Sequence, residues 1–191
     1  MTYMLIVPPA SEPLSLAEAK AHLRLDTADE DDLVTALIIA ARQIVEKHTG
    51  LALLTQTWRI VADSWPALPP VRLPLRPFAS LAAVRVFDQA NVATLLAPAT
   101  YFVDAQPYAA RLQFANTPPA PGRAIAGIEL DVVAGFGAAP ATVPEPLRLA
   151  IRMLVAHWFE ARGDAAGDAS PRQIPVVVEA LLQPFRRLRL V

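Results

Sequence analysis

The clearest pattern in the sequence is the helical periodicity of residues 142–163, TVPEPLRLAIRMLVAHWFEARG. Its apolar residues recur every three to four positions, which is the spacing of one buried helix face. Thr142 and Glu145 have capping-box spacing, and Gly163 marks the expected end. The pattern therefore predicts a long amphipathic helix. The residues expected on its buried face are Leu147, Ala150, Ile151, Leu154, Val155, Trp158 and Phe159, and those expected on its solvent side are Arg148, Arg152 and Glu160.

Two more helices are predicted near the start of the chain. Residues 15–25 begin with Ser15 and Glu18 in capping-box spacing. Residues 33–50 carry an apolar stripe that ends at Gly50, and the acidic run before it complements the helix dipole. The stripe comprises Leu33, Leu37, Ala41, Ile44, Val45 and His48. Ile39 lies off this stripe, so we expect it to contact another chain.

Between these helices the pattern changes to short segments rich in β-branched and aromatic residues, which turn residues separate. The predicted strands are residues 55–61, 71–75, 80–87, 100–104, 111–114 and 128–133. We therefore predict an α+β protein in which a small helical bundle, residues 1–51 and 142–183, carries an inserted antiparallel β-sandwich or barrel, residues 52–141. Residues 176–182 are predicted to form a short helix, and residues 184–191 a docking tail.

Composition limits the classes of function. Of the 191 residues, 54% are hydrophobic and 18% charged, which favours self-association. A formal net charge of -1 excludes a strong overall electrostatic match to nucleic acid or to an anionic membrane. The chain has no cysteine, and no apolar run reaches the length of about 20 residues that a membrane span requires. We expect a soluble, intracellular protein.

Catalytic and metal-binding patterns are scarce. The histidines, His22, His48 and His157, occupy three different predicted helices without a second ligand four residues away, which gives no zinc site. Gly135 and Gly137 form a single G-x-G that is typical of a strand-to-helix turn. We predict no catalytic, cofactor or metal residues. A paired-carboxylate site remains an alternative, for which the candidates are Asp88, Asp104 and Asp131.

The tail from residue 184 alternates basic and apolar side chains, PFRRLRLV. This pattern is too apolar for an ordinary disordered end and indicates docking on a partner. A loosely attached end with solvated arginines and weak, salt-dependent binding of nucleic acid are the alternatives. The acidic run of residues 26–32 has the opposite charge to the tail, so that adjacent copies could pair the two.

Several ordered blocks resemble the head-tail connector, or adaptor, proteins of tailed phages and gene transfer agents. They are LSLAEAKAHLRLD, DDLVTALIIAARQIVEKHTGLALLTQTWRI, VVAGFG, VPEPLRLAIRMLVAHWFEARGD and VEALLQPFRRLRL. The resemblance extends from Leu14 to Leu190, and its specificity comes from the order of the blocks. It leaves open whether the particle is a virus or a gene transfer agent.

The resemblance implies a structural protein without catalytic residues, made in the host cytoplasm and located in the particle neck. It implies a ring, expected to match a twelve-fold portal, that extends the DNA channel between the portal and a stopper or tail-terminator protein. DNA would pass without specific binding, and no membrane is involved. The implied portal-binding residues are Phe185, Arg186, Arg187, Leu188, Arg189 and Leu190. The expected inter-subunit residues are Asp29, Asp31, Asp32, Ile39, Arg42, Arg148 and Arg152. The alternative function is a carbohydrate-binding or hydrolytic β module on a helical scaffold.

Overall fold

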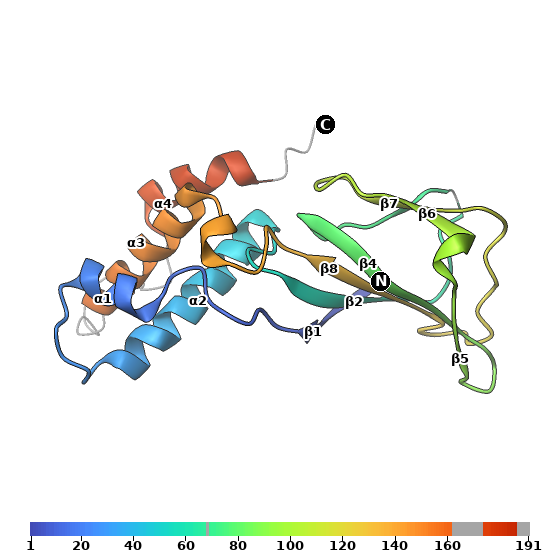
Figure 1. Ribbon diagram of the computed structural model, residues 1–191, viewed down its shortest axis with the longest axis horizontal. Coiled ribbons are helices and arrows are strands. Elements are labelled where there is room, and N and C mark those ends of the chain that lie inside the picture. Colours follow the sequence, from blue (N-terminus) through green and yellow to red (C-terminus); the bar gives the residue numbers. More distant parts are fainter. Residues whose placement is uncertain (68, 162–173, 187–191) are drawn as a thin grey trace. The chain divides into compact units, whose positions relative to one another are not determined.

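The computed structural model describes residues 1–67, 69–161 and 174–186 (Figure 1). These residues form two compact units, each built from two separate stretches of the chain. Met1–Pro9 and Thr55–Phe136 form the β unit, while Ala10–Leu54 and the described part of Gly137–Val191 form the helical unit. The fold is α+β, as the residue pattern predicted.

The helical unit contains four helices that contact one another (Figure 1). They are α1 (Leu16–Leu23), α2 (Asp31–Thr49), α3 (Glu145–Ala161) and α4 (Val176–Leu182), and a 3-10 turn, Gln183–Phe185, follows α4. The predicted capping box at the start of α1 is confirmed, because the Ser15 hydroxyl accepts the Glu18 N–H and the Glu18 carboxylate accepts the Ser15 N–H. Gly50 ends α2 with a left-handed φ of 68°.

The buried face of α3 is the predicted one. Its fully buried residues are Leu147, Ala150, Ile151, Leu154 and Val155, whereas Trp158 and Phe159 are half-buried. The start of the helix differs from the prediction. Thr142 closes a 3-10 turn, Pro140–Thr142, by donating its hydroxyl to the Ala139 carbonyl, while Glu145 pairs with arginines of α3. Arg148 is only 15% exposed, so its expected position on the solvent side was wrong. Gly163 lies outside the described residues.

The buried face of α2 is rotated by about one residue from the predicted stripe. Its buried residues are Val34, Ile38, Ala41, Arg42, Val45 and Thr49. Leu33, which was expected inside, is 37% exposed. The prediction failed because it treated Arg42 as polar and therefore as outward-facing. Carboxylate partners neutralise this guanidinium, and Arg42 then joins the buried side.

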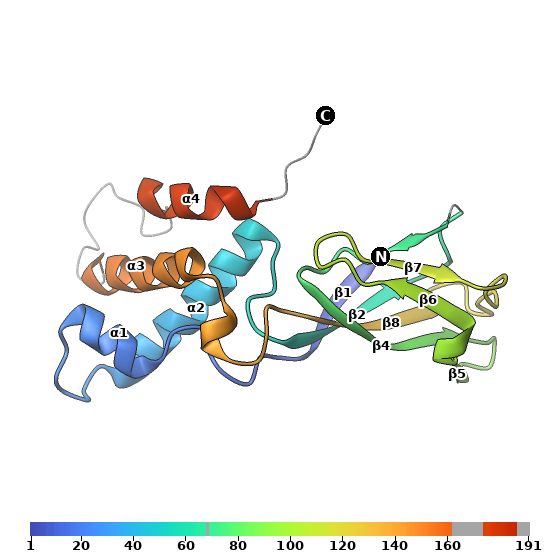
Figure 2. The ribbon, with the colours of Figure 1, turned by 45° about the horizontal axis from the view of Figure 1, so that its top comes forward.

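The β unit consists of two antiparallel sheets (Figure 2). The larger sheet has the order β1-β2-β8-β4-β5, and the smaller sheet has the order β3-β7-β6. The strands are β1 (Thr2–Val7), β2 (Gln56–Ala62), β3 (Val71–Arg72), β4 (Phe78–Phe87), β5 (Ala93–Leu95), β6 (Tyr101–Asp104), β7 (Arg111–Phe114) and β8 (Ile128–Ala134). A further 3-10 turn, Pro98–Thr100, precedes β6.

Both sheets share one apolar core. It includes Ile60 of β2, Val84 of β4, Leu112 of β7 and Leu130 of β8, each at most 1% exposed. Side chains from two sheets that meet in this way form a sandwich. Over the described residues the larger sheet does not close into a barrel, because β1 and β5 remain at its two ends.

Two strands were not predicted. β1 belongs to the β unit, although residues 1–51 were expected with the helices. Its sequence, TYMLIV, lacks the polar alternation of a half-buried strand. β5 spans three residues, too few for a periodic signal. Every residue of both strands is exposed, so their sequences lack the alternation that burial of one face produces.

The turn after β8 confirms the prediction for the G-x-G. Gly135 has a φ of 138° and Gly137 a φ of 153°, which L-residues with a side chain rarely adopt. A Cβ on Gly137 would also lie 2.8 Å from the side chain of Thr142. The two glycines serve the backbone path from the last strand toward α3.

A carboxylate in the middle of the larger sheet connects three strands. Asp131 of β8 is 5% exposed, and its oxygens accept from Arg59 Nε at 2.7 Å and from Arg85 Nη1 at 2.6 Å. Glu129 adds an ion pair to Arg59 at 3.2 Å. Burial by itself raises the pKa of Asp131, but the hydrogen bonds and charges of the two arginines outweigh it, so that the pKa lies below its ordinary value.

We expect Asp131→Asn to lower the free energy of unfolding by about 2 kcal/mol at pH 7, since charge-assisted hydrogen bonds of a buried carboxylate are lost. Because the folded-state pKa is depressed, the contribution is complete above the unfolded-state pKa of about 3.9 and is lost as the pH falls through the folded-state value. Denaturant titrations from pH 7 to 3 should show the difference between the two proteins narrowing only below about pH 4.

Asp104→Asn is the matched control, because Asp104 pairs with Arg111, whose side chain is 54% exposed. It should cost less than about 1 kcal/mol. Two outcomes would contradict a stabilising role for the ion pairs of Asp131. One is an equal loss of unfolding free energy in the two variants, and the other is a loss in Asp131→Asn that does not change with pH.

Candidate assembly surfaces

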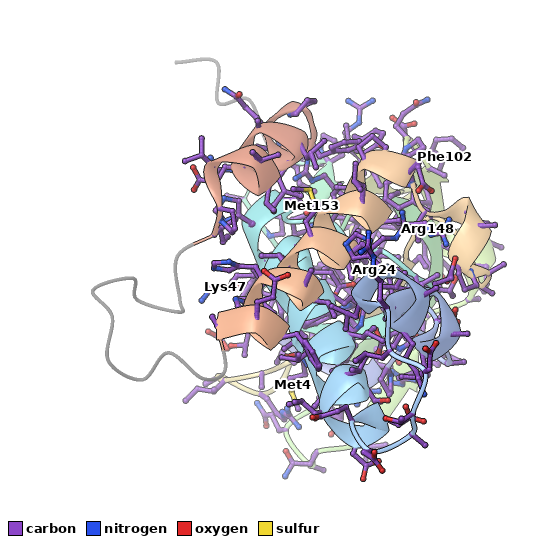
Figure 3. The ribbon with its side chains drawn as sticks, turned by 90° about the vertical axis from the view of Figure 1, so that its left-hand side faces the viewer. Met4, Arg24, Lys47, Phe102, Arg148 and Met153 are labelled. Atoms are coloured by element: carbon purple, nitrogen blue, oxygen red, sulfur yellow. The ribbon has the colours of Figure 1, made fainter. Side chains whose placement is uncertain are left out.

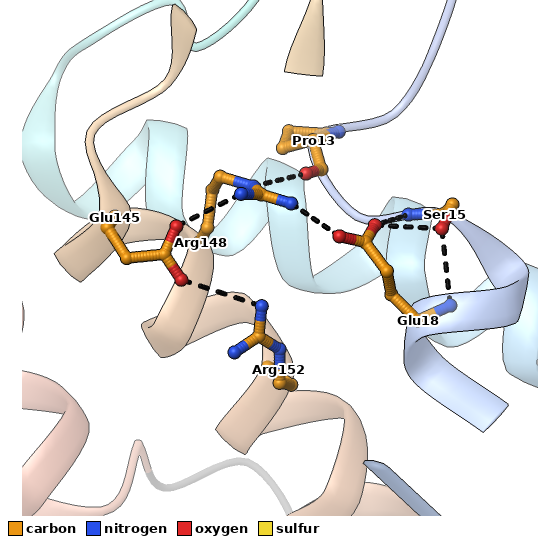
Figure 4. A network of polar contacts seen from close by, with 6 residues as sticks. All are labelled: Pro13, Ser15, Glu18, Glu145, Arg148 and Arg152. Carbon is orange, nitrogen blue, oxygen red and sulfur yellow. Dashed lines mark hydrogen bonds and ion pairs between the residues drawn. The ribbon is translucent and has the colours of Figure 1, made fainter. Parts of the chain in front are cut away.

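A network around Arg148 joins α3 to the start of α1 (Figure 4). Its Nε donates to the Pro13 carbonyl at 3.0 Å, Nη1 donates to Glu145 at 3.0 Å, and Nη2 donates to Glu18 at 2.6 Å. The Ser15 N–H lowers the pKa of Glu18 most, and its hydroxyl and Arg148 lower it further. The side chain of Arg148 is thus used within the chain.

A second internal network surrounds Arg42 of α2. Its Nε donates to Glu12 at 2.7 Å and its Nη1 donates to Glu46 at 2.8 Å. Glu46 also accepts the Leu53 N–H at 2.9 Å. Burial alone lowers the pKa of Arg42, but the two carboxylates hold it above its ordinary value. Arg42 therefore fixes the segments before α1 and after α2 onto α2.

The acidic residues near the start of α2 differ in their surroundings. Asp31 pairs with Lys20 of α1 at 2.6 Å. Asp29 and Asp32 are exposed. The structure thus leaves these two acids on the surface, next to the N-terminal end of α2.

One side of α2 is exposed along its whole length, and we call it the α2 outer stripe. It consists of Asp32, Leu33, Ala36, Ile39, Gln43 and Lys47. Leu33 is 37% and Ile39 36% exposed. Figure 3 labels Lys47 at its far end. Ile39 was predicted as an outward contact residue. Leu33 was instead assigned to the buried stripe, because its spacing fits that stripe as well as the spacing of the buried Val34 does. The stripe combines apolar side chains with an acid at one end and a base at the other.

On α3 the exposed residues include Glu145 and Leu149, and Leu149 is 36% exposed. Arg152 is 24% exposed and lies 3.6 Å from Glu145, a looser ion pair than those of Arg148. A cationic and apolar patch therefore remains on α3, on a different helix from the α2 outer stripe.

The C-terminal end of the described chain is attached to α2. Val178 and Leu182 of α4 are buried, and Phe185 is half-buried. Arg186 is exposed and its Nη2 donates to Nε2 of His48. The other predicted portal-binding residues, Arg187, Leu188, Arg189 and Leu190, lie outside the described residues.

The aspartates proposed for a hydrolytic site have separate structural roles. The carboxylate of Asp88 accepts the N–H groups of Ala90 and Val92 in the turn before β5. Asp104 pairs with Arg111 within the smaller sheet, and Asp131 lies in the larger one. Among the described residues no group of three or more His, Cys, Asp or Glu is arranged to hold a metal ion.

A surface depression of about 690 Å³ in the β unit is lined by aromatic, proline and amide side chains, which include Trp65, Phe114 and Asn116. The rings of Trp65 and Phe114 pack edge to face, 4.8 Å apart, and the indole N–H of Trp65 donates to the Pro119 carbonyl. Both rings also pack against the core of the sandwich. Their contacts therefore stabilise the loops, and the depression gives the carbohydrate-binding alternative no specific support. Separately, none of the helices in the described ranges is long and apolar enough to cross a membrane.

Comparison with known proteins gives one consistent result. Residues 13–77 match the model of the phage gp6-like head-tail connector proteins. Three solved chains are similar over 100% of this chain and 98% of their own length. One is from the virion of a native gene transfer agent particle, with 27% identity and a TM-score of 0.81. Another is from the neck of an empty particle computed with C6 symmetry, with 28% identity and a TM-score of 0.81. The third is from the neck of a native particle computed with C12 symmetry, with 26% identity and a TM-score of 0.78. No protein of curated function matches the sequence.

We predict that Arg148→Met lowers the free energy of unfolding of the helical unit by about 2 kcal/mol, because three acceptors lose a charged donor while the aliphatic packing remains. Arg24→Met is the control, since Arg24 is exposed at the end of α1 (Figure 3). Helical circular dichroism during denaturant unfolding measures both variants. A cost no larger than that of the control would show that the network does not hold α1 against α3.

Proposed function

We propose that this chain is a head-tail connector of the phage gp6-like kind, which its residues 13–77 match, and that it forms a ring of identical copies in the neck of a phage or phage-like particle. The ring lies between the portal and the next neck protein, a stopper or tail terminator. The family is one of structural connectors rather than of enzymes. The observation that carries the proposal is the similarity, over the full chain, to chains of necks with C6 and C12 symmetry. That symmetry supports twelve copies.

The ring requires two different complementary surfaces on each copy, because a cyclic assembly uses head-to-tail contacts. The α2 outer stripe is one surface that we propose, together with Asp29. The patch of Leu149 and Arg152 on α3 is its proposed counterpart on the next copy. Apolar side chains face each other in this pairing, and the exposed acids meet an arginine. Asp31, Arg42 and Arg148 support these surfaces through their contacts within the chain.

We propose that the C-terminal residues, from Phe185 to Leu190, bind the portal. The attachment of Arg186 to α2 places the start of the tail on the helical unit. The alternation of basic and apolar residues continues to the end of the chain. DNA passes through the ring without specific binding, which the formal net charge of -1 favours.

Ile39→Glu should reduce ring formation at least tenfold without changing the melting temperature, because a charge is placed in an apolar contact while the side chain remains exposed in the free chain. Mass photometry across a concentration series counts the rings. Ala17→Glu, on the exposed side of α1, is the control and should assemble normally. Normal rings from Ile39→Glu would exclude the α2 outer stripe as a ring contact.

Removal of residues 187–191 should abolish capture of the chain by its portal protein while the fold stays intact, because the truncation keeps the contact of Arg186 with His48. A pull-down with tagged portal measures capture, and a chain that lacks only Val191 is the control. Undiminished capture of the shorter chain would remove the tail from the mechanism. Electron microscopy of the chain with its portal tests the ring itself, and a solitary chain at the vertex would refute it.

A further inference from the structure

β1 is an edge strand that carries no charged residue or proline, although its pairing with β2 is irregular between Leu5 and Val7. It is bonded to β2 on one side only among the described strands. Its apolar side chains are exposed on both faces, from 37% for Ile6 to 53% for Val7. Its sequence, TYMLIV, contains no charged residue. Natural proteins usually block such edges with charges, prolines or bulges, because unpaired N–H and C=O groups recruit other strands. The regular part of this edge, residues 2–5, is therefore open to pairing with a further strand.

The opposite edge of the same sheet is open in a similar way. β5, with the sequence ATL, pairs with β4 alone among the described strands and is exposed throughout. Val92 is 60% and Leu95 64% exposed. Like β1, β5 has no charge. One rigid sheet thus presents two uncharged edges that face away from each other.

The directions of the two edge strands are compatible. Every neighbouring pair in the larger sheet is antiparallel, so β1, β8 and β5 run in one direction while β2 and β4 run in the other. Copies placed side by side in a ring keep nearly the same orientation. β1 of one copy would then meet β5 of the next as a parallel strand, which the hydrogen-bond pattern of sheets allows.

We propose that β1 of each copy adds onto the β5 edge of its neighbour, so that the larger sheets join around the ring. This inference rests on the proposed ring. A second copy is the occupant because both uncharged edges are on the same chain, and a closed circle covers both edges of every copy at once. A different protein bound to β1 would leave β5 open. Backbone pairing also needs no matching side chains, which fits two edges that carry no charge.

The absence of cysteine allows a direct test of this pairing. Each of Tyr3, Met4 and Leu5 is replaced by Cys together with Thr94→Cys in the full chain, and the rings are oxidised mildly. Adjacent strands lie about 4.8 Å apart, within the Cα separation that a disulfide tolerates. At least one pair should give a ladder of covalent oligomers on non-reducing gels. Gln113→Cys with Thr94→Cys, which places one thiol on the smaller sheet, is the control and should give none.

The outcomes separate this proposal from the ring. Rings seen by mass photometry without any covalent ladder would overturn the strand pairing and leave the ring intact. Covalent dimers from Met4→Cys alone would show that two β1 strands pair with each other or that β1 is uncovered, and would also overturn it. A chain that stays monomeric both in solution and in isolated particles would refute the ring and the pairing together.

A charge at the edge gives an independent readout. Met4→Lys with Leu5→Lys should lower the population of rings at least tenfold while the melting temperature stays unchanged, since both side chains are exposed in the single copy. Lys substitutions at two exposed positions of α1, Ala17 and Ala21, form the charge-matched control. Full ring formation by the β1 variant would contradict the proposal.

Discussion

The surface of the helical unit is determined by two arginines that have their partners inside it. A guanidinium removed from water requires carboxylates or carbonyls around it, because an unpaired buried charge is costly. Arg42 and Arg148 meet this requirement with Glu12, Glu46, Glu18, Glu145 and the Pro13 carbonyl. Their charges are therefore not presented outward. What remains exposed is the α2 outer stripe with its apolar side chains, the acids near its start and the looser ion pair of Arg152.

In the β unit the main constraint is the pairing of backbone groups at the edges of the larger sheet. Its two sheets bury a common core, yet the larger sheet stays open at β1 and β5. An open sheet satisfies its edge backbone groups with water or with another strand. Side chains would determine specificity in the proposed contacts of the helices, whereas backbone groups would determine the proposed contacts of β1 and β5. A ring that used both kinds of contact would be specific in its partner and tolerant of substitutions along the strands.

The sequence predicted the elements with strong periodicity and missed those without it. α3, the capping box at Ser15 and the turn at Gly135 and Gly137 follow from local chemistry and are confirmed. The buried face of α2 was predicted about one residue out of place. The reason is that burial of Arg42 depends on Glu12, thirty residues earlier, and such a distant partner leaves no local pattern in the sequence. The ion pairs of Asp131 were missed for the same reason, because Arg59 and Arg85 are also distant from it in the sequence. β1 pairs with residues fifty or more positions away, so only tertiary structure identifies it.

The missed features share a physical cause that also bears on function. Apolar periodicity reflects burial within one chain. A residue that becomes buried only in an assembly can therefore be apolar at a position where this periodicity does not expect it. Leu33 and the strand TYMLIV are apolar by sequence and exposed in the single copy. In a chain that is 54% hydrophobic and similar to neck proteins of gene transfer agents, exposed apolar residues at such positions fit the contacts between copies that we propose. The disagreement between pattern and burial therefore falls on the surfaces that we propose for contacts between copies.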